Sequence, residues 1–238
     1  MTPMDALALA GQAVFAAYVA GFLLLTRRMA HASGDDPWLF ARRSGTQRWT
    51  VLAFRLGFAL LAALPLIRLI APRTPETVAA WPAALGWLGL LLAVAGAGLA
   101  LRAQAHMGAF WRIGAAEGGL GRLVTDGPFA WSRNSVFLRQ IVLVWGVALG
   151  GDPAAAALAL VVTVAAVTQV AVEERVIAAG PGAEYAANRA RVNRWLGRKR
   201  DEGAGWAATR SRPAPGGCWP RPGSWRWPRR LARSSSAR

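Results

Sequence analysis

The sequence predicts an all-α, polytopic membrane protein with about five transmembrane helices, including a C-terminal helical hairpin. Hydrophobic residues make up 54% of the 238 residues and charged residues only 17%, whereas about 25% of the residues of a soluble domain are charged. The apolar residues are concentrated in long stretches, and about 20 of them span a bilayer as one helix. We divide the chain into a first part with three transmembrane helices and a cytoplasmic loop at 27–49, a second part with the hairpin at 136–172, and a tail; these parts are residues 1–101, 102–200 and 201–238.

Four stretches have the length of a membrane span, and they cover residues 6–26, 50–70, 78–101 and 154–172. Only the second contains charged residues, Arg55 and Arg68, which lie near its two ends. Long basic side chains near the ends of a span can extend to the bilayer interface, so both arginines are compatible with a membrane helix.

The hairpin consists of a shorter apolar segment, 136–150, and the span at 154–172. Gly151, Asp152 and Pro153 separate the two. Aspartate followed by proline is a typical helix start, with the carboxylate as cap and the proline at the first helical position. Small residues elsewhere predict close helix packing; they are Gly89, Ala93, Gly96, Ala97 and Ala100.

The distribution of basic residues predicts the orientation. Five arginines lie between the first and second spans, only Arg73 lies between the second and third, and none lies in the hairpin turn. Cytoplasmic loops carry an excess of Lys and Arg. We therefore expect five crossings of a cell inner membrane, with the N-terminus outside and the C-terminus in the cytoplasm.

The composition also excludes some classes of site. Two histidines and one cysteine exclude a His/Cys metal cage and an internal disulfide. The tail 201–238 has eight arginines, two acidic residues and no hydrophobic periodicity, so disorder is expected. Arginine and tryptophan together permit stacking on nucleic acid, and a position beside a membrane favours contact with anionic lipids over that role. A poorly ordered extension is favoured over both, and no nucleic-acid partner is expected.

Polar segments 103–135 and 173–200 flank the hairpin, so they are expected to meet on one side of the membrane. Glu173 and Glu174 stand where the apolar run ends, and two carboxylates at a helix C-terminus are unfavourable. If the helix continues past Val172, both become ordinary solvated residues. The alternative is that one of them faces back toward Arg133.

Five ordered motifs surround the hairpin: Leu123-Val124-Thr125-Asp126-Gly127-Pro128-Phe129, Arg133-Asn134-Ser135-Val136-Phe137, Glu173-Glu174, Gly182-Ala183-Glu184-Tyr185 and Val192-Asn193-Arg194-Trp195. In their order and spacing these motifs resemble the membrane methyltransferases of the isoprenylcysteine carboxyl methyltransferase and phospholipid methyltransferase superfamily. The resemblance covers about 85 residues. It implies a methyltransferase-like catalytic region in residues 102–200.

The resemblance implies S-adenosylmethionine as methyl donor and a small or lipophilic acceptor, such as a carboxylate, thiol or amine, that enters from the lipid phase. The residues implied in catalysis are Arg133, Glu174 and Arg194. Those implied in binding the donor are Gly127, Pro128, Phe129, Arg133, Asn134, Phe137, Glu173, Glu174 and Tyr185. No metal is implied, and the oligomeric state is left open.

Four positions depart from the family pattern. Ser135 and Gly197 replace common prolines, Arg139 replaces a small residue and Asn188 replaces a common tyrosine. Two alternatives therefore stand beside the methyltransferase. One is an NADPH-dependent membrane reductase of the sterol-reductase type, and the other is a non-catalytic membrane protein that retains the fold.

Overall fold

The structure, a computed structural model, describes residues 3–34, 46–71, 82–108, 111, 123–179 and 182–199. In this part of the chain the elements are α1 (Pro3–Ser33), α2 (Thr46–Ile70), α4 (Ala83–Met107), the short 3-10 helix η3 (Gly127–Ala130), α5 (Ser135–Ala148), α6 (Pro153–Ala179) and α7 (Gly182–Arg191). The predicted disordered tail at 201–238 lies outside the described residues.

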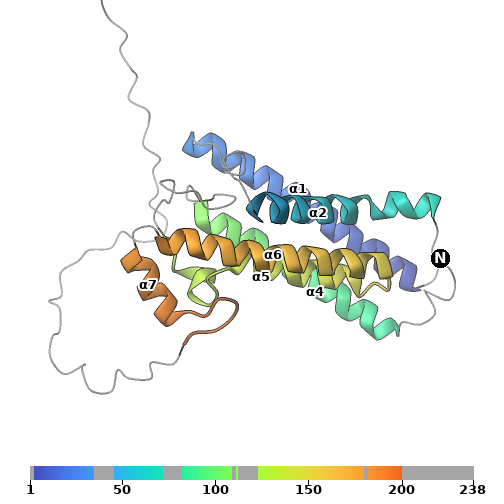
Figure 1. The fold of residues 1–238 in the computed structure, drawn as a ribbon. Helices are drawn as coiled ribbons and strands as arrows, with labels where there is room; N and C mark the ends of the chain where they lie inside the picture. The colour runs from blue at the N-terminus through green and yellow to red at the C-terminus, as the bar shows by residue number, and fades with distance from the viewer. Residues whose placement is uncertain are drawn as a thin grey trace, which may run out of the picture. The chain divides into compact units, whose positions relative to one another are not determined.

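The predicted fold class is confirmed: the described elements are helical, and four helices are long and apolar enough to cross a membrane. These four are α1, α2, α4 and α6, and they correspond to the four predicted spans. Helix α5 has only 14 residues, which is roughly 21 Å at 1.5 Å per residue and shorter than the apolar core of a bilayer. The hairpin therefore pairs a short helix with a long one (Figure 1).

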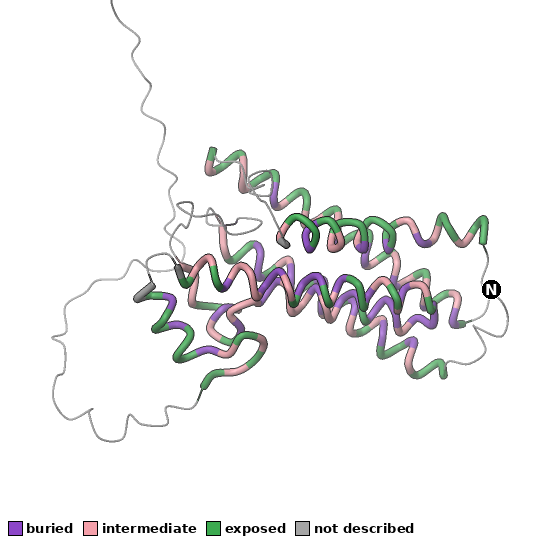
Figure 2. Tube along the Cα trace, viewed as in Figure 1, coloured by how far each residue is buried: buried purple, intermediate pink, exposed green. Residues whose placement is uncertain are grey.

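Many large apolar residues of the long helices are exposed, and Figure 2 shows exposed residues along the bundle. Ile70 and Leu91, for example, are 90% and 65% exposed. Water disfavours such surfaces, whereas lipid tails are as apolar as the side chains themselves. The exposed faces of these helices are therefore suited to contact lipid.

Helices α4 and α5 pack closely through the predicted small residues. A Cβ atom added to Gly96 would lie 2.6 Å from the backbone nitrogen of Leu143, and one added to Gly89 would lie 2.6 Å from the carbonyl oxygen of Gly146. Ala93 and Ala97 on the same face of α4 are buried. Small residues allow the two backbones to approach, which places the start of α5 beside the end of α4.

The turn between α5 and α6 forms as predicted. The backbone N–H of Ala154 donates to Asp152 Oδ1 at 2.9 Å, and Pro153 is the first residue of α6. The same carboxylate also accepts hydrogen bonds from Arg68 Nε at 2.9 Å and Arg68 Nη2 at 2.6 Å. Arg68 therefore joins the end of α2 to the hairpin turn instead of extending alone to the interface.

Helix α6 continues past Val172 to Ala179, so the carboxylates of Glu173 and Glu174 lie within the helix rather than at its end. Beyond it, α7 and the segment that leads into α5 lie together at one end of the bundle (Figure 1). The hydrogen bonds that join these segments form the candidate site.

Candidate functional site

Glu174 lies at the centre of a cluster of basic and amide side chains. Its Oε1 atom accepts hydrogen bonds from Arg133 Nη2 at 3.0 Å, Arg133 Nε at 3.3 Å and Asn134 Nδ2 at 3.0 Å. Its Oε2 atom accepts from Arg194 Nε at 2.9 Å. The continuation of α6 does not leave this carboxylate solvated: the side chain of Glu174 is only 10% exposed and that of Arg133 only 7%.

The arrangement saturates the carboxylate. An ionised carboxylate offers about four acceptor positions, and the chain's own donors fill them. Two guanidinium groups against one carboxylate leave the cluster with a surplus positive charge. We call these four residues, Arg133, Asn134, Glu174 and Arg194, the Glu174 cluster. Because its charges are mostly buried, removal of one partner would leave the others uncompensated.

A turn after α7 holds the segment before α5 through its backbone. The N–H of Gly197 donates to the carbonyl of Trp131 at 2.8 Å, and the N–H of Arg133 donates to the carbonyl of Asn193 at 3.2 Å. Gly197 has φ of +96°, which proline cannot adopt, and proline has no N–H to donate. A proline is common at the position of Gly197 in the methyltransferases that this sequence resembles. Here the backbone conformation and the donated hydrogen bond both require a residue other than proline.

The structure also gives a local reason for Ser135, which stands where a proline is common in the methyltransferases that this sequence resembles. Ser135 is fully buried, and its hydroxyl lies 2.6 Å from the carbonyl of Pro128 and 3.0 Å from that of Ser132. The hydroxyl thus fastens η3 to the first turn of α5, which a proline at this position could not do. Gly127, Pro128 and Phe129 are connected to the Glu174 cluster through this contact.

Glu173 faces a different helix from Glu174. Its Oε1 accepts from Gln169 Nε2 at 2.9 Å, and Gln169 Oε1 in turn accepts from Thr50 of α2 at 2.9 Å. Phe137 also faces α2, where its ring lies 6.0 Å from that of Phe54. Both were predicted to contact the donor, and the structure places neither of them in the Glu174 cluster.

Tyr185 lies on α7 beneath the guanidinium of Arg133, whose Cζ is 5.9 Å from the ring centroid. Its hydroxyl is buried and has no hydrogen-bond partner among the described residues, and the same holds for Oδ1 of Asn188 one turn later. Burial raises the pKa of Tyr185, and the negative charge of Glu174 raises it further, against the weaker opposing effect of nearby arginines. The hydroxyl therefore remains protonated at neutral pH and is available as a donor.

The prediction missed His106. Its Nε2 atom lies 3.2 Å from Asp126 Oδ1, and its ring lies 6.5 Å from that of Phe129. A Cβ added to Gly127 would meet this ring at 2.6 Å, so the glycine lets the turn approach the histidine. With only two histidines in the chain, the presence of one shortly before the motif was the available signal. Its proximity to Asp126, 20 residues later, required the fold.

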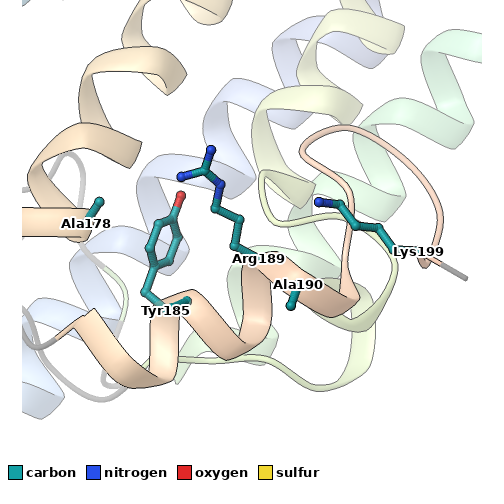
Figure 3. Close-up of a pocket in the computed structure, with 6 residues that line it drawn as sticks. Ala178, Tyr185, Arg189, Ala190 and Lys199 are labelled. Carbon is teal, nitrogen blue, oxygen red and sulfur yellow. The ribbon is translucent and has the colours of Figure 1, made fainter. Parts of the chain in front are cut away.

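A pocket of about 360 Å³ lies beside the cluster, between the last turn of α6 and α7 (Figure 3). The residues that line it are Ala178, Tyr185, Ala186, Arg189, Ala190 and Lys199. The carbonyl of Arg189 accepts a hydrogen bond from Arg133 Nη1 at 3.4 Å. Arg133 of the Glu174 cluster thus also holds the backbone of Arg189, which lines the pocket.

The structure therefore brings the predicted residues Arg133, Asn134, Glu174 and Arg194 into direct contact, with Tyr185 against them. It joins the Gly127 turn to them through one intermediate residue. Comparison with protein-family models, curated proteins and solved structures finds no match to this chain.

Proposed function

We propose that the protein is an S-adenosylmethionine-dependent methyltransferase of the membrane, similar to isoprenylcysteine carboxyl methyltransferases, that acts on a small or lipophilic acceptor. The observation that carries the proposal is the Glu174 cluster. It connects the Arg133-Asn134 motif, Glu174 of the glutamate pair and Arg194 of the Val192–Trp195 motif, which stand far apart in sequence. These are the motifs on which the family resemblance rests.

When bound, S-adenosylmethionine supplies an electrophilic methyl group on a sulfonium, whose sulfur keeps the electron pair of the broken bond as the acceptor takes the methyl group. The protein has to align donor and acceptor and to exclude water. In the proposal Glu174 is a positioning residue, since its oxygens are occupied by Arg133, Asn134 and Arg194. It holds the end of the hairpin and the turn after α7 at fixed positions.

The turn at Asp126 and Gly127, which lies next to the Glu174 cluster, fits a cationic methyl donor. Asp126 in this turn has an exposed carboxylate. The pocket at Tyr185 fits a sulfonium poorly, because Arg189 and Lys199 line it. We therefore place the donor against the Gly127 turn.

His106 gives this site a proton acceptor. A carboxylate acceptor needs no base, whereas an amine or thiol must lose a proton during transfer. Histidine is the side chain that ordinarily serves as a general base, and Asp126 Oδ1 lies 3.2 Å from Nε2 of His106. His106 would therefore serve amine and thiol acceptors.

We further propose an inner-membrane location with the Glu174 cluster in the cytoplasm. The support is the excess of arginine on the segments at this end of the bundle. The acceptor would reach the site from the lipid around the exposed apolar faces of the helices.

Calorimetric titration of the detergent-purified full chain with S-adenosylmethionine tests the proposal. We expect saturable heat for one site. No heat at saturating donor, in a sample whose circular dichroism is helical, would contradict the proposal.

One observation favours a second candidate, a non-catalytic membrane protein that retains the fold. The carboxylate of Glu174 has no acceptor position left for a ligand. Donor binding without methyl transfer over a panel of carboxylate, thiol and amine acceptors would favour this candidate over the enzyme.

A further inference from the structure

The pocket between α6 and α7 has a composition that the methyl-transfer proposal does not use. Three of its six lining residues are alanines, Ala178, Ala186 and Ala190. Their small side chains leave the space of about 360 Å³ open. The remaining three, Tyr185, Arg189 and Lys199, are a hydrogen-bond donor and two cations.

Neither cation has a carboxylate partner in the described part of the chain. Their backbones, in contrast, are fixed: the carbonyl of Arg189 accepts from Arg133, and the N–H of Lys199 donates to the carbonyl of Arg191 at 2.9 Å. Figure 3 shows the Lys199 side chain extending toward α7, where Arg189 lies. Two positive charges thus lie at one pocket without a carboxylate partner among the described residues.

The hydroxyl of Tyr185 adds a neutral donor. Tyr185 is only 6% exposed, and its hydroxyl has no hydrogen-bond partner in the part of the chain that the structure describes. Figure 3 shows this hydroxyl at the same end of the pocket as the Arg189 guanidinium. A buried polar group without a partner is costly, and an acceptor atom bound in the pocket would remove that cost.

We propose that this pocket binds a phosphate group. A phosphate offers several acceptor oxygens and negative charge, which match the guanidinium, the ammonium and the tyrosine hydroxyl together. A cationic ligand would meet two uncompensated positive charges. The site is therefore distinct from that of the sulfonium donor, and the inference does not depend on methyl transfer.

The position along α6 favours a lipid headgroup as the source of the phosphate. The apolar run of α6 ends at Val172, and Ala178 at the pocket lies roughly 9 Å further along the helix at 1.5 Å per residue. Polar headgroups occupy roughly 5–8 Å on each side of the hydrocarbon core, so a pocket at this height lies at the outer edge of the headgroup zone. A soluble phosphate has the same chemistry and is distinguished by experiment.

The test uses native mass spectrometry of the detergent-purified full chain. The probes are phosphatidic acid, diacylglycerol as the same lipid without phosphate, and inorganic phosphate as competitor. We expect the chain to retain phosphatidic acid and not diacylglycerol. The double variant Arg189→Gln/Lys199→Gln should weaken retention at least about tenfold, since each hydrogen bond to a charged group contributes about that factor.

Tyr185→Phe removes only the hydroxyl and should weaken retention by roughly threefold to tenfold. The matched control is Arg191→Gln/Arg198→Gln, which removes the same charge from two exposed residues that do not line the pocket. We expect the control to change retention less than about twofold, as for dispersed surface charges. Circular dichroism of every variant checks that the helices are intact.

Three results would overturn the proposal: equal weakening by the control pair, equal retention of diacylglycerol, or no binding of either phosphatidic acid or inorganic phosphate. Displacement of the lipid only by a large molar excess of inorganic phosphate would identify a lipid source. Binding of inorganic phosphate without binding of the lipid would identify a soluble source for the same site.

Discussion

The guanidinium of Arg68 donates two hydrogen bonds to the carboxylate of Asp152, from Nε at 2.9 Å and from Nη2 at 2.6 Å. The two residues lie 84 positions apart, at the end of α2 and at the turn between α5 and α6. The same carboxylate caps α6 through the N–H of Ala154. One side chain therefore serves both as a helix cap and as the attachment of α2 to the hairpin.

This attachment predicts a stability that depends on pH. Burial acts to raise the pKa of Asp152, but the hydrogen bonds from Arg68 and from the backbone outweigh burial and hold the pKa below its ordinary value. A depressed pKa in the folded state gives stability that is present above the unfolded pKa of about 3.9 and is lost as the pH falls through the folded value. We expect Asp152→Asn to lower the free energy of unfolding at pH 7 by about 1–2 kcal/mol, and therefore to unfold at a lower temperature than the parent. The variant should lose less stability than the parent on acidification.

Thermal unfolding in detergent, followed by circular dichroism between pH 7 and pH 2.5, measures this. Asp126→Asn is the matched control, because the side chain of Asp126 is 81% exposed. A parallel acid response in Asp152→Asn and the parent would mean that the Arg68 contact does not contribute.

Glu174→Gln should both destabilise the protein and weaken donor binding. The substitution keeps the shape of the side chain but leaves the buried Arg133 without its counter-charge, which typically costs about 3–5 kcal/mol. We expect donor affinity to fall at least about tenfold because the Asn134 region loses its support. Unfolding temperature and calorimetric titration with S-adenosylmethionine provide the two measurements.

The control for this variant is Glu184→Gln on α7, which changes an exposed carboxylate and should have little effect on either quantity. Equal loss of donor affinity in both variants would argue against a site at the inner end of the hairpin.

Gly96→Ala should destabilise the pairing of α4 with α5. The added Cβ would lie 2.6 Å from the nitrogen of Leu143 and 2.8 Å from the carbonyl oxygen of Arg139, which are backbone atoms that cannot rotate away. We expect a loss of about 1–3 kcal/mol, as for other overpacked interiors. Gly98→Ala in the same helix is the control, because no atom lies within 4 Å of its added Cβ. The unfolding temperatures of the two variants should differ clearly, and equal values would refute the close helix contact.

His106→Gln should affect acceptors unequally. Removal of a general base typically lowers rates by about 10²–10⁴, so transfer to a lipophilic thiol such as dodecanethiol should fall by such a factor. Transfer to dodecanoate, which has no proton to lose, should change less than about threefold, since the base takes no part in that reaction. Radiolabelled methyl transfer to the two acceptors measures both rates. An equal decrease for both would assign His106 a structural role instead.

The spans were predictable because the apolar length of a helix is a local property of the sequence. The cap at Asp152 and the small residues of α4 followed from equally local rules, and the structure bears out both. The expectation that one glutamate faces Arg133 also rested on local information, namely that polar segments on either side of a hairpin return to the same end.

The tertiary structure alone decided which of the two glutamates faces Arg133 and which residues that glutamate contacts. Glu174 faces Arg133, Asn134 and Arg194, while the adjacent Glu173 faces Gln169 on the side of α2. Successive residues of a helix point about 100° apart, so this choice depends on how α6 is rotated against its neighbours.

Helix packing also decided the Asp126–His106 pair and the Arg68–Asp152 bond. It likewise placed Arg189 and Lys199 together at the pocket between α6 and α7. Hydrophobicity and turn chemistry are read from neighbouring residues, so the sequence by itself determined an all-helical membrane protein with a hairpin and its polar end. The long-range hydrogen bonds described above join groups that are 20 to 119 residues apart. Only the packing of the helices decides which of these groups come within hydrogen-bond distance of one another, and the identity of the site depends on those contacts.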